Sequence, residues 1–523
     1  MNFKRKLWWA QHRTDVYKYS TFILLLLVIT ISIIYFTYSK FSSSNEMTMY
    51  ETTVEPFIKN DYFIASYIDG EWSNEIPGKN DGYVVDKIVC DNGAVGTWDN
   101  DKWAITIENA TKKIKCGVYF KQIYTDNVIA EAPKLAQGMI PVKFDDTGNV
   151  VVADTSTKWY DYSKHEWANA VLVNCADSTI KSKYFDSDNK VLASAVGKTI
   201  SMDEIMQMYV YIPRYKYQLF NAENGTSNPQ AINITFESKT TAKSTGTKNG
   251  EWLTHPAFTF GDKELAGIWV GKFETSNTSE LPKIVPNVSS LRSMKVSAQF
   301  NTSRLMTTTL ASTYGTSTND DSHMMKNMEW GAVAYLSSSV YGRYTNASTC
   351  IESGCEVWIN NNSSYTTGCA GSSVSASKVS TCNAWNTATG VNASTTGNIY
   401  GIYDMSGGAW EYVMGNYNDT IGDYAGFSSM PEAKYYDKYM GTDSASDFTK
   451  YHLGDATKET LKAKSQGSNS WYGDNSSSVR SSYPWVSRGG YYGNGTNAGV
   501  FYFGYTFGLS ASSTSFRVVL GAL

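Results

Sequence analysis

The residues that could carry out chemistry are few and scattered along this chain. Its 5 histidines share no local motif, and none stands four residues from another, as a His-x-x-x-His metal motif requires. His165 and Glu166 are adjacent, but neighbours in a strand point to opposite faces, so they do not form an acid–base pair. A histidine-centred catalytic site is therefore not predicted. The histidines are His12, His165, His255, His323 and His452.

The 7 cysteines are few for 523 residues, so apolar cores must carry most of the stability. Cys90 and Cys116 lie on segments that could be neighbouring strands, and we predict a disulfide between them, although the sequence alone does not fix the partner. Cys175 has no obvious partner, and we expect a buried thiol.

Four further cysteines lie in an insertion, residues 341–391, that is rich in Ser, Thr, Asn and Gly. Zinc binding is one interpretation, but the spacings are irregular and no Cys-x-x-Cys knuckle is present. Disulfides that staple an exposed polar loop are favoured in an exported protein. The simplest pairing joins Cys350 with Cys355 and Cys369 with Cys382, and three connectivities are possible.

Two stretches near the C-terminal end hold the strongest motifs. In residues 401–413 (GIYDMSGGAWEYV), Gly407 and Gly408 stand between a Tyr-Asp-Met turn and a Trp-Glu-Tyr strand. Glycine adopts backbone angles that a side chain forbids, so a sharp turn is predicted there. The second stretch opens with residues 488–490 (RGG) and closes with residues 516–520 (FRVVL).

This pair of stretches resembles the formylglycine-generating, or sulfatase-modifying, family, whose domain has a C-type-lectin-like fold. The resemblance covers about residues 201–523 and implies an α+β, C-type-lectin-like C-terminal domain. Near the first stretch, Gly408 stands for the family's usual Asn and Tyr412 for its usual Trp. The residues that match the family there are Asn398, Gly401, Tyr403, Asp404, Met405, Gly407, Trp410 and Glu411.

The resemblance also carries over a structural calcium site. Its ligands would be the side chains of Asp404 and Glu411 and the backbone carbonyls of Gly407 and Ala409, which are hard oxygen donors suited to Ca²⁺. The alternative is a metal-free arrangement, in which Asp404 caps the turn and Glu411 pairs with Arg488 or Arg517. Both interpretations stay open at the level of sequence.

The family's enzymatic activity is not expected here. Its copper-binding cysteines lie four and nine residues after the second glycine, and those positions are Asn494 and Gly499 in this chain. No cysteine follows Cys382, and a copper–thiolate oxidase needs the sulfurs as ligands and nucleophile. We therefore expect no copper and no enzyme of this family. An enzyme of an unrecognised type on the same scaffold is the alternative.

The loop of residues 491–514 is built almost entirely from Tyr, Gly, Ser, Asn and Phe. Adaptable binding surfaces use these residues, because rigid aromatics supply contact area and small polar residues supply hydrogen bonds. Phe501, Phe503 and Phe516 are expected to complete the core. The predicted ligand-binding residues are Tyr491, Tyr492, Gly493, Asn494, Tyr502, Gly504, Tyr505, Phe507, Leu509 and Ser510.

The same C-terminal pattern resembles the variable regions of retroelement-diversified proteins, which display a hypervariable ligand-binding face on a lectin-like scaffold. This resemblance implies a ligand-binding or adhesion protein whose partner is an extracellular protein or glycan. A net charge of −4 gives no reason to expect nucleic acid as a partner.

The elements that must position these residues come after an apolar run near the N-terminus. Residues 21–39 are long enough for a transmembrane helix, and the positive charges before them place residues 1–20 in the cytoplasm. The sequence thus predicts a single-pass cell-membrane protein with an extracellular body. Its predicted parts are a linker (40–52), a β-sandwich-like module (53–127), a β-rich spacer (128–200) and the lectin-like domain (201–523).

Overall fold

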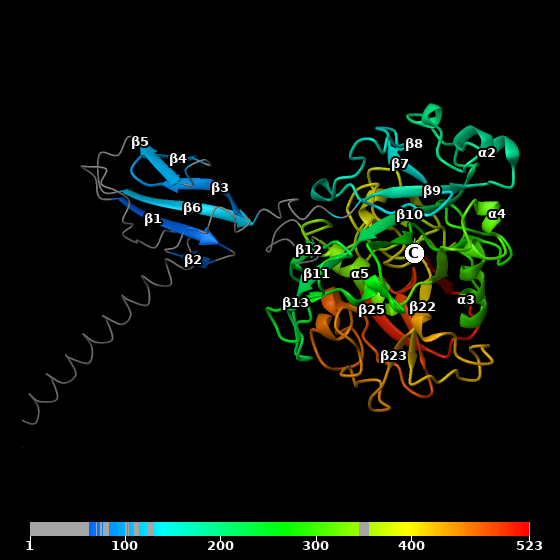
Figure 1. Cartoon of the computed structure of the whole chain (residues 1–523). Helices are drawn as coiled ribbons and strands as arrows, with labels where there is room; N and C mark the ends of the chain where they lie inside the picture. Colours follow the sequence, from blue (N-terminus) through cyan, green and yellow to red (C-terminus); the bar gives the residue numbers. More distant parts are fainter. Residues whose placement is uncertain are drawn as a thin grey trace, which may run out of the picture. The chain divides into compact units, whose positions relative to one another are not determined.

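The computed structural model describes residues 62–68, 71–73, 76, 83–99, 102, 104–108, 114–122, 130, 132–344 and 355–521. The chain divides into two compact units, Met1–Thr125 and Asp126–Leu523. Both are rich in strands and poor in helices, so the architecture is mixed and mainly β. Figure 1 labels the helices and strands of both units.

The first unit contains a sheet of strand order β2-β1-β6-β3 and a separate hairpin of β4 and β5. Ile64, Val118 and Phe120 form its buried core, against which Trp98 and Ile105 pack. The predicted disulfide between Cys90 and Cys116 is confirmed, and it joins directly paired positions of β3 and β6. The strands are β1 (Tyr62–Ile68), β2 (Glu71–Ser73), β3 (Tyr83–Cys90), β4 (Val95–Asp99), β5 (Ala104–Glu108) and β6 (Ile114–Gln122).

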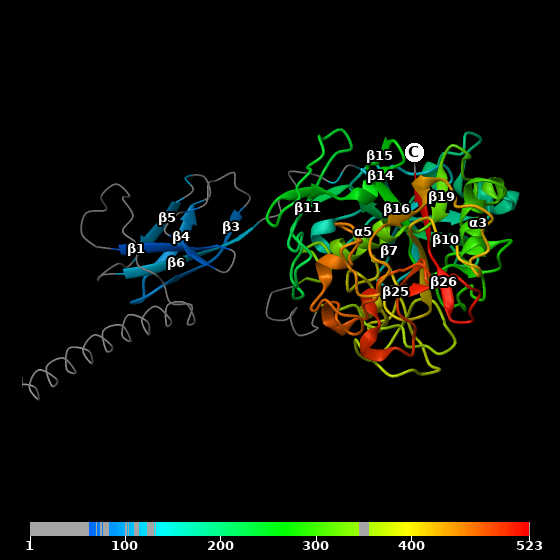
Figure 2. The ribbon, with the colours of Figure 1, turned by 90° about the horizontal axis from the view of Figure 1, so that it is seen from below.

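The second unit is built on a seven-stranded sheet of order β19-β27-β16-β10-β9-β7-β8. Its central strand β10 is buried along its whole length, as expected for a mainly apolar segment, and Gln207 is buried with its neighbours. Figure 2 shows the C-terminal segment beside β16 and β19. The strands are β7 (Ile140–Phe144), β8 (Val150–Val152), β9 (Asn169–Val173), β10 (Ile205–Pro213), β16 (Gly267–Gly271), β19 (Asp321–Met324) and β27 (Val518–Gly521).

This sheet corrects the domain boundary expected at residue 201. Strands β7, β8 and β9 come from the predicted spacer, residues 128–200, yet β9 pairs directly with β10. Side-chain patterns reveal that a segment is a strand but not which strand it pairs with, so the spacer could not be assigned to this sheet from sequence. The second unit instead begins at Asp126.

A second sheet carries both glycine-containing stretches of the sequence. Its order is β23-β22-β24-β25, and β26 pairs with the remaining part of β22. Arg488 of β24 lies opposite Glu411 of β22, so the two stretches are directly hydrogen-bonded. The strands are β22 (Trp410–Tyr417), β23 (Asp437–Tyr439), β24 (Trp485–Gly489), β25 (Gly499–Thr506) and β26 (Thr514–Phe516).

Short elements surround the two sheets. A three-stranded sheet has order β12-β11-β13, and three pairs form small hairpins: β14 with β15, β17 with β18, and β20 with β21. These strands are β11 (Tyr215–Gln218), β12 (Ile234–Phe236), β13 (Trp252–Thr254), β14 (Thr259–Phe260), β15 (Lys263–Glu264), β17 (Ser276–Asn277), β18 (Pro282–Lys283), β20 (Cys369–Ala370) and β21 (Asn383–Ala384). The α-helices are α2 (Ser178–Tyr184), α3 (Val296–Arg304), α4 (Ala311–Tyr314) and α5 (Asn327–Ser337).

Helix α5 lies in the core of the second unit. All of its residues are buried, and the Trp330 indole donates to the Val500 carbonyl of β25 at 2.8 Å. The helix begins at Asn327. His323 belongs instead to β19, which pairs with β27.

The insertion is stapled as predicted where the structure describes it. Cys369 and Cys382 form a disulfide beside the β20–β21 hairpin. Cys355 is also disulfide-bonded. Residues 345–354, which include Cys350, lie outside the described residues. Cys175 is a buried free thiol, as expected.

The membrane prediction requires a correction. A spanning helix needs about 20 apolar residues, and no helix of the described residues is long and apolar enough to cross a bilayer. This finding counts against a single-pass cell-membrane protein, and we do not retain that localisation or the membrane as a partner. The stretch on which the prediction rested, residues 21–39, lies outside the described residues, together with 1–20 and 40–52.

Candidate ligand-binding face

The pairing of β22, β24 and β25 brings part of the predicted binding loop onto one side of a sheet. Phe501 and Phe503 of β25 are 2% and 0% exposed and face the core, whereas Tyr502 between them is partly exposed. Ser487 of β24 lies opposite Gly504 of β25 and opposite Tyr412 of β22. Because side chains alternate along a strand, these three positions share a face.

A cavity of about 260 Å³ opens on this face. Gly504 leaves room for it, because a Cβ at that position would lie 3.0 Å from Ser487 Oγ and 3.1 Å from Tyr502 Oη. The Tyr412 hydroxyl donates to the Leu509 carbonyl and accepts from Thr506 Oγ1, which ties the following loop to the strands. The lining residues are Trp410, Tyr412, Ser487, Tyr502, Tyr505, Thr506, Leu509, Ala511, Ser513 and Thr514.

A chain of aromatic side chains in contact leaves the cavity on the Trp410 side. The Trp410 and Tyr491 rings lie 4.4 Å apart and tilted, and Tyr491 meets Tyr492 edge-on at 5.0 Å. Tyr492 packs edge-on against Tyr365 at 4.8 Å, and the Arg292 guanidinium lies 3.9 Å from the centre of the Tyr365 ring. Packed rings with a cation at the end form a rigid contact surface at low entropic cost.

A similar chain leaves the cavity on the Tyr505 side. Tyr483 packs against Tyr505 at 4.6 Å and against Phe507 at 4.1 Å, and Phe507 contacts the exposed ring of Tyr424. The Arg480 guanidinium lies over both Tyr483 and Tyr505. We call the cavity and its two flanking chains the aromatic face. Its aromatic members are Tyr365, Trp410, Tyr412, Tyr424, Tyr483, Tyr491, Tyr492, Tyr502, Tyr505 and Phe507.

The other predicted binding residues lie at the edge of this face. Asn494 Oδ1 accepts from the Tyr491 backbone N–H at 2.8 Å, so it holds the turn that carries Tyr491 and Tyr492. Gly493 and Ser510 are exposed. Of the predicted binding residues, Tyr502, Tyr505 and Leu509 therefore line the cavity, and Gly504 lies against Ser487 and Tyr502.

Several residues of the face were missed by sequence reasoning. Trp410 and Tyr412 were read only as parts of a scaffold motif, although their alternation along a strand could have placed them on a face with Ser487. Tyr365 and Arg292 come from distant segments. Nothing in their local sequence indicates that they meet Tyr492.

The proposed calcium ligands are engaged by protein donors. Both oxygens of Glu411 bond to the Arg517 guanidinium, at 3.1 Å through Nε and more closely through Nη2. Asp404 accepts from the Gly368 N–H at 2.8 Å and from the Asn360 amide at 2.8 Å. Within the described ranges, no group of three or more His, Cys, Asp or Glu side chains is arranged to hold a metal ion. Glu411 therefore pairs with Arg517, and Asp404 bonds to groups outside its own turn.

Burial has the largest effect on the pKa values of Glu411, Asp404 and Glu274. It raises the pKa of Glu411 to about 7, although the Arg517 charge opposes the shift. Burial likewise raises the pKa of Asp404, and it raises that of Glu274 well above its usual range. Glu274 accepts from the Ala409 N–H at 2.8 Å, so it supports the glycine turn that contains Gly407 and Gly408. One arginine thus faces several buried carboxyl groups, and burial shifts each of them toward its neutral form.

The two positions that correspond to copper-binding cysteines have other roles here. Asn494 caps the turn after β24, and Gly499 opens β25. A Cβ at position 499 would fall 2.1 Å from Asp474 Oδ2, so this position has no room for a side chain.

Comparison with known proteins adds little. No protein-family model matches the chain, and no curated protein matches it. Among solved structures, one chain entitled Treponema denticola variable protein 1 aligns over 62% of this chain and 98% of its own length. The identity is 11% and the TM-score is 0.24. The resemblance to the sulfatase-modifying family therefore stays an inference from sequence motifs.

Proposed function

We propose that this chain is a non-catalytic ligand-binding or adhesion protein that binds an extracellular protein or glycan through its aromatic face. The scaffold in this proposal is a C-type-lectin-like domain. The observation that carries the proposal is the cavity between Trp410, Tyr412, Tyr502 and Tyr505, flanked by aromatic side chains in contact with one another. Aromatic anchors around a concavity are where binding energy concentrates in protein interfaces.

The composition of the face supports recognition rather than catalysis. A cavity of about 260 Å³ lined by tyrosine, tryptophan, serine and threonine offers contact area and hydroxyl groups. It contains no histidine, cysteine, carboxylate or lysine that could serve as acid, base or nucleophile. Arg292 and Arg480 add positive charge at its two ends, where rim charges guide association.

The position of Gly499 supports the same proposal. A copper–thiolate site would need a cysteine there, and the Asp474 carboxyl group occupies that space. The disulfides Cys90–Cys116 and Cys369–Cys382 fit an oxidising, extracellular environment.

Diversification of the face is a further part of this proposal. The positions expected to vary include Tyr491, Tyr492, Tyr502 and Tyr505, whose side chains all lie on the aromatic face. A gene next to a reverse transcriptase, with a near-copy of its 3′ end that differs at adenines, would support diversification. If neither is found, diversification is rejected and ligand binding remains.

The test of binding uses the full-length protein on an array of immobilised glycans and surface proteins. We expect Tyr502→Ala and Tyr505→Ala each to weaken every detected interaction by at least about tenfold, as hot-spot residues do. Tyr436→Ala is the matched control, because Tyr436 is a partly exposed tyrosine bonded to Asp419, outside the face.

Gly504→Val provides an independent variant, since it fills the cavity without removing an aromatic ring. Its melting temperature shows whether the fold is retained. Ligands that bind all three face variants as well as they bind the unaltered protein would show that the aromatic face is not the binding site.

A further inference from the structure

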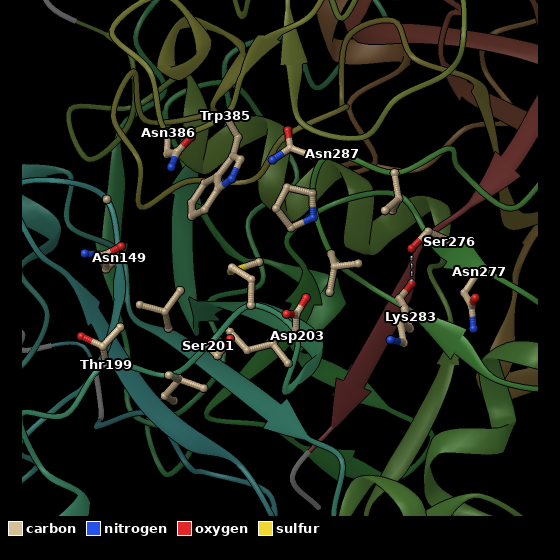
Figure 3. A pocket seen from close by; sticks show the side chains of 18 of the residues that line it. Asn149, Thr199, Ser201, Asp203, Ser276, Asn277, Lys283, Asn287, Trp385 and Asn386 are labelled. Carbon is tan, nitrogen blue, oxygen red and sulfur yellow. Dashed lines mark hydrogen bonds between the residues drawn. The ribbon is translucent and has the colours of Figure 1, made fainter. Parts of the chain in front are cut away.

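A large cavity on the second unit lies apart from the aromatic face and belongs to no predicted site. Its volume is about 790 Å³, which is in the range of small-molecule pockets. Figure 3 shows its walls, formed by the start of β8, the segment that leads into β10, the β17–β18 hairpin and the loop after it, and residues 385–386. These segments are far apart in sequence, so no local motif marks the cavity.

The polar side chains around this cavity are mostly uncharged. They are amides and hydroxyls from every wall, and they include Asn149, Asn277, Asn287, Asn386, Thr199, Ser201, Ser276 and Ser289. The charged side chains that line it are Asp203 and Lys283, which have opposite signs. The lining contains no arginine or histidine, and the charges of Lys283 and Asp203 cancel, so the lining has no net formal charge that would favour an anionic or a cationic ligand.

Several of these groups are available to a ligand. The side chains of Thr199, Ser201, Asn287 and Asn386 have no hydrogen-bond partner in the part of the chain that the structure describes, whereas Ser276 Oγ donates to the Lys283 carbonyl, as Figure 3 shows. Amides and hydroxyls can each donate and accept, so they match the paired hydroxyl groups of a sugar.

Apolar groups complete the lining. Val288 and Met202 are 40% and 39% exposed, which is unusual for large apolar side chains in this protein. Val285 and Ile205 lie deeper and are buried. A sugar ring presents hydroxyls at its edge and C–H groups on its faces, so it can use both kinds of lining at once. A hydrophobic ligand would leave the free amides unpaired, at a cost for each one.

We propose that this cavity binds a neutral mono- or disaccharide. The proposal rests on the juxtaposition of unpaired amides and hydroxyls with exposed Val288 and Met202, and it is independent of the aromatic face.

The test is ligand-observed NMR on the full-length protein with glucose, galactose, mannose, N-acetylglucosamine, cellobiose, lactose and chitobiose. We expect at least one of these sugars to bind. The double variant Thr199→Val with Asn386→Ala should weaken that binding by at least about tenfold, because it removes two unpaired hydrogen-bonding groups. Ser201→Trp, which fills the cavity, should abolish it.

Two controls separate this site from others. Asn228→Ala removes an exposed amide outside the cavity and should leave sugar binding unchanged. Tyr502→Ala should do the same, although it impairs the aromatic face. Melting curves show that each variant is folded.

Three outcomes would overturn the proposal: binding of none of the sugars, equal binding by the folded Ser201→Trp variant, or a preference of tenfold or more for glucuronic acid or glucosamine over glucose. The last result would mean that Lys283 or Asp203 sets the ligand class. Failure of the sugar test leaves the array test of the aromatic face untouched.

Discussion

Gly499 is a residue at which a buried carboxyl group packs directly against the backbone. Asp474 is fully buried, and its Oδ2 accepts from the Phe501 N–H at 2.9 Å. Burial raises the pKa of Asp474 well above its usual range, and the carboxyl group packs against the β25 backbone. The glycine at 499 is what makes this approach possible.

We predict that Gly499→Ala destabilises the fold by about 1–3 kcal/mol, the usual cost of overpacking a filled core. Urea unfolding measures this loss. Gly504→Ala is the matched control on the same strand, because its new methyl group would meet only the movable ends of Ser487 and Tyr502. Equal stabilities of the two variants would contradict the assigned contact with Asp474.

His323 is a second residue whose side chain should have a measurable effect on stability. Its ring lies between two carboxylates, with Nδ1 at 2.7 Å from Asp321 and Nε2 at 2.9 Å from Glu329. Burial alone would lower the pKa of His323, but the two carboxylates outweigh it and raise this pKa to about 9. Arg304 pairs with Asp321, and the Lys326 charge faces Glu329, so both acids remain ionised.

The sign of the pH effect follows from the raised pKa. In the unfolded chain a histidine has a pKa near 6.5. The stabilisation of the fold by charged His323 is therefore complete below pH 6.5 and is lost as the pH rises through about 9. The loss amounts to about 3 kcal/mol for a shift of this size. Chemical unfolding of the unaltered protein and of His323→Gln from pH 6 to 10 measures this loss. We expect the difference in free energy of unfolding between the two proteins to shrink as the pH rises. A difference that stays constant would refute the charged histidine.

At the scale of elements, one buried ion pair joins two sheets. Glu411 lies on β22, and Arg517 stands between β26 and β27. The Arg517 guanidinium also donates to the Gly271 and Tyr403 carbonyls, so it links β16 and the Tyr-Asp-Met turn as well. It occupies the Glu411 oxygens that a calcium ion would need.

We therefore predict that calcium does not contribute to stability. The melting temperature should be the same in excess EDTA and in millimolar Ca²⁺, as a bound ligand would raise it by mass action. Arg517→Met should lower the free energy of unfolding by about 3–5 kcal/mol, because it leaves the buried carboxylate of Glu411 unpaired. A melting temperature that falls in EDTA would restore the calcium interpretation of Asp404 and Glu411.

The elements also show where sequence reasoning succeeds. The glycine turn at Gly407 and Gly408 and the inward positions of Phe501 and Phe503 depend on local backbone preference and on alternation, which sequence reveals. The contact of Tyr492 with Tyr365 and the large cavity depend on segments far apart in the chain. These could not be predicted, because no local pattern encodes which distant segments meet.

At the scale of the whole molecule, the seven-stranded sheet decides where the second unit begins. Strands β7, β8 and β9 precede residue 201, and β27 is the last strand of the chain, yet all four belong to one sheet. Tyr162 reinforces this continuity, because its hydroxyl donates to the Tyr211 carbonyl of β10 at 2.8 Å. Trp167 is fully buried, and its indole donates to the Tyr341 carbonyl at 2.7 Å.

A truncation experiment tests this assignment. We predict that a fragment of residues 126–523 folds, with a cooperative melting transition and a monomer-sized elution volume. A fragment of residues 201–523 should aggregate or lack that transition, because it strips β9 from β10 and exposes an apolar edge strand that pairs with other chains. Trp167→Ala in the longer fragment is a milder change than the truncation. It should lower the free energy of unfolding by about 3–5 kcal/mol. Should the shorter fragment melt as cooperatively as the longer one, residues 126–200 would be a separate spacer after all, and the sheet would not depend on them.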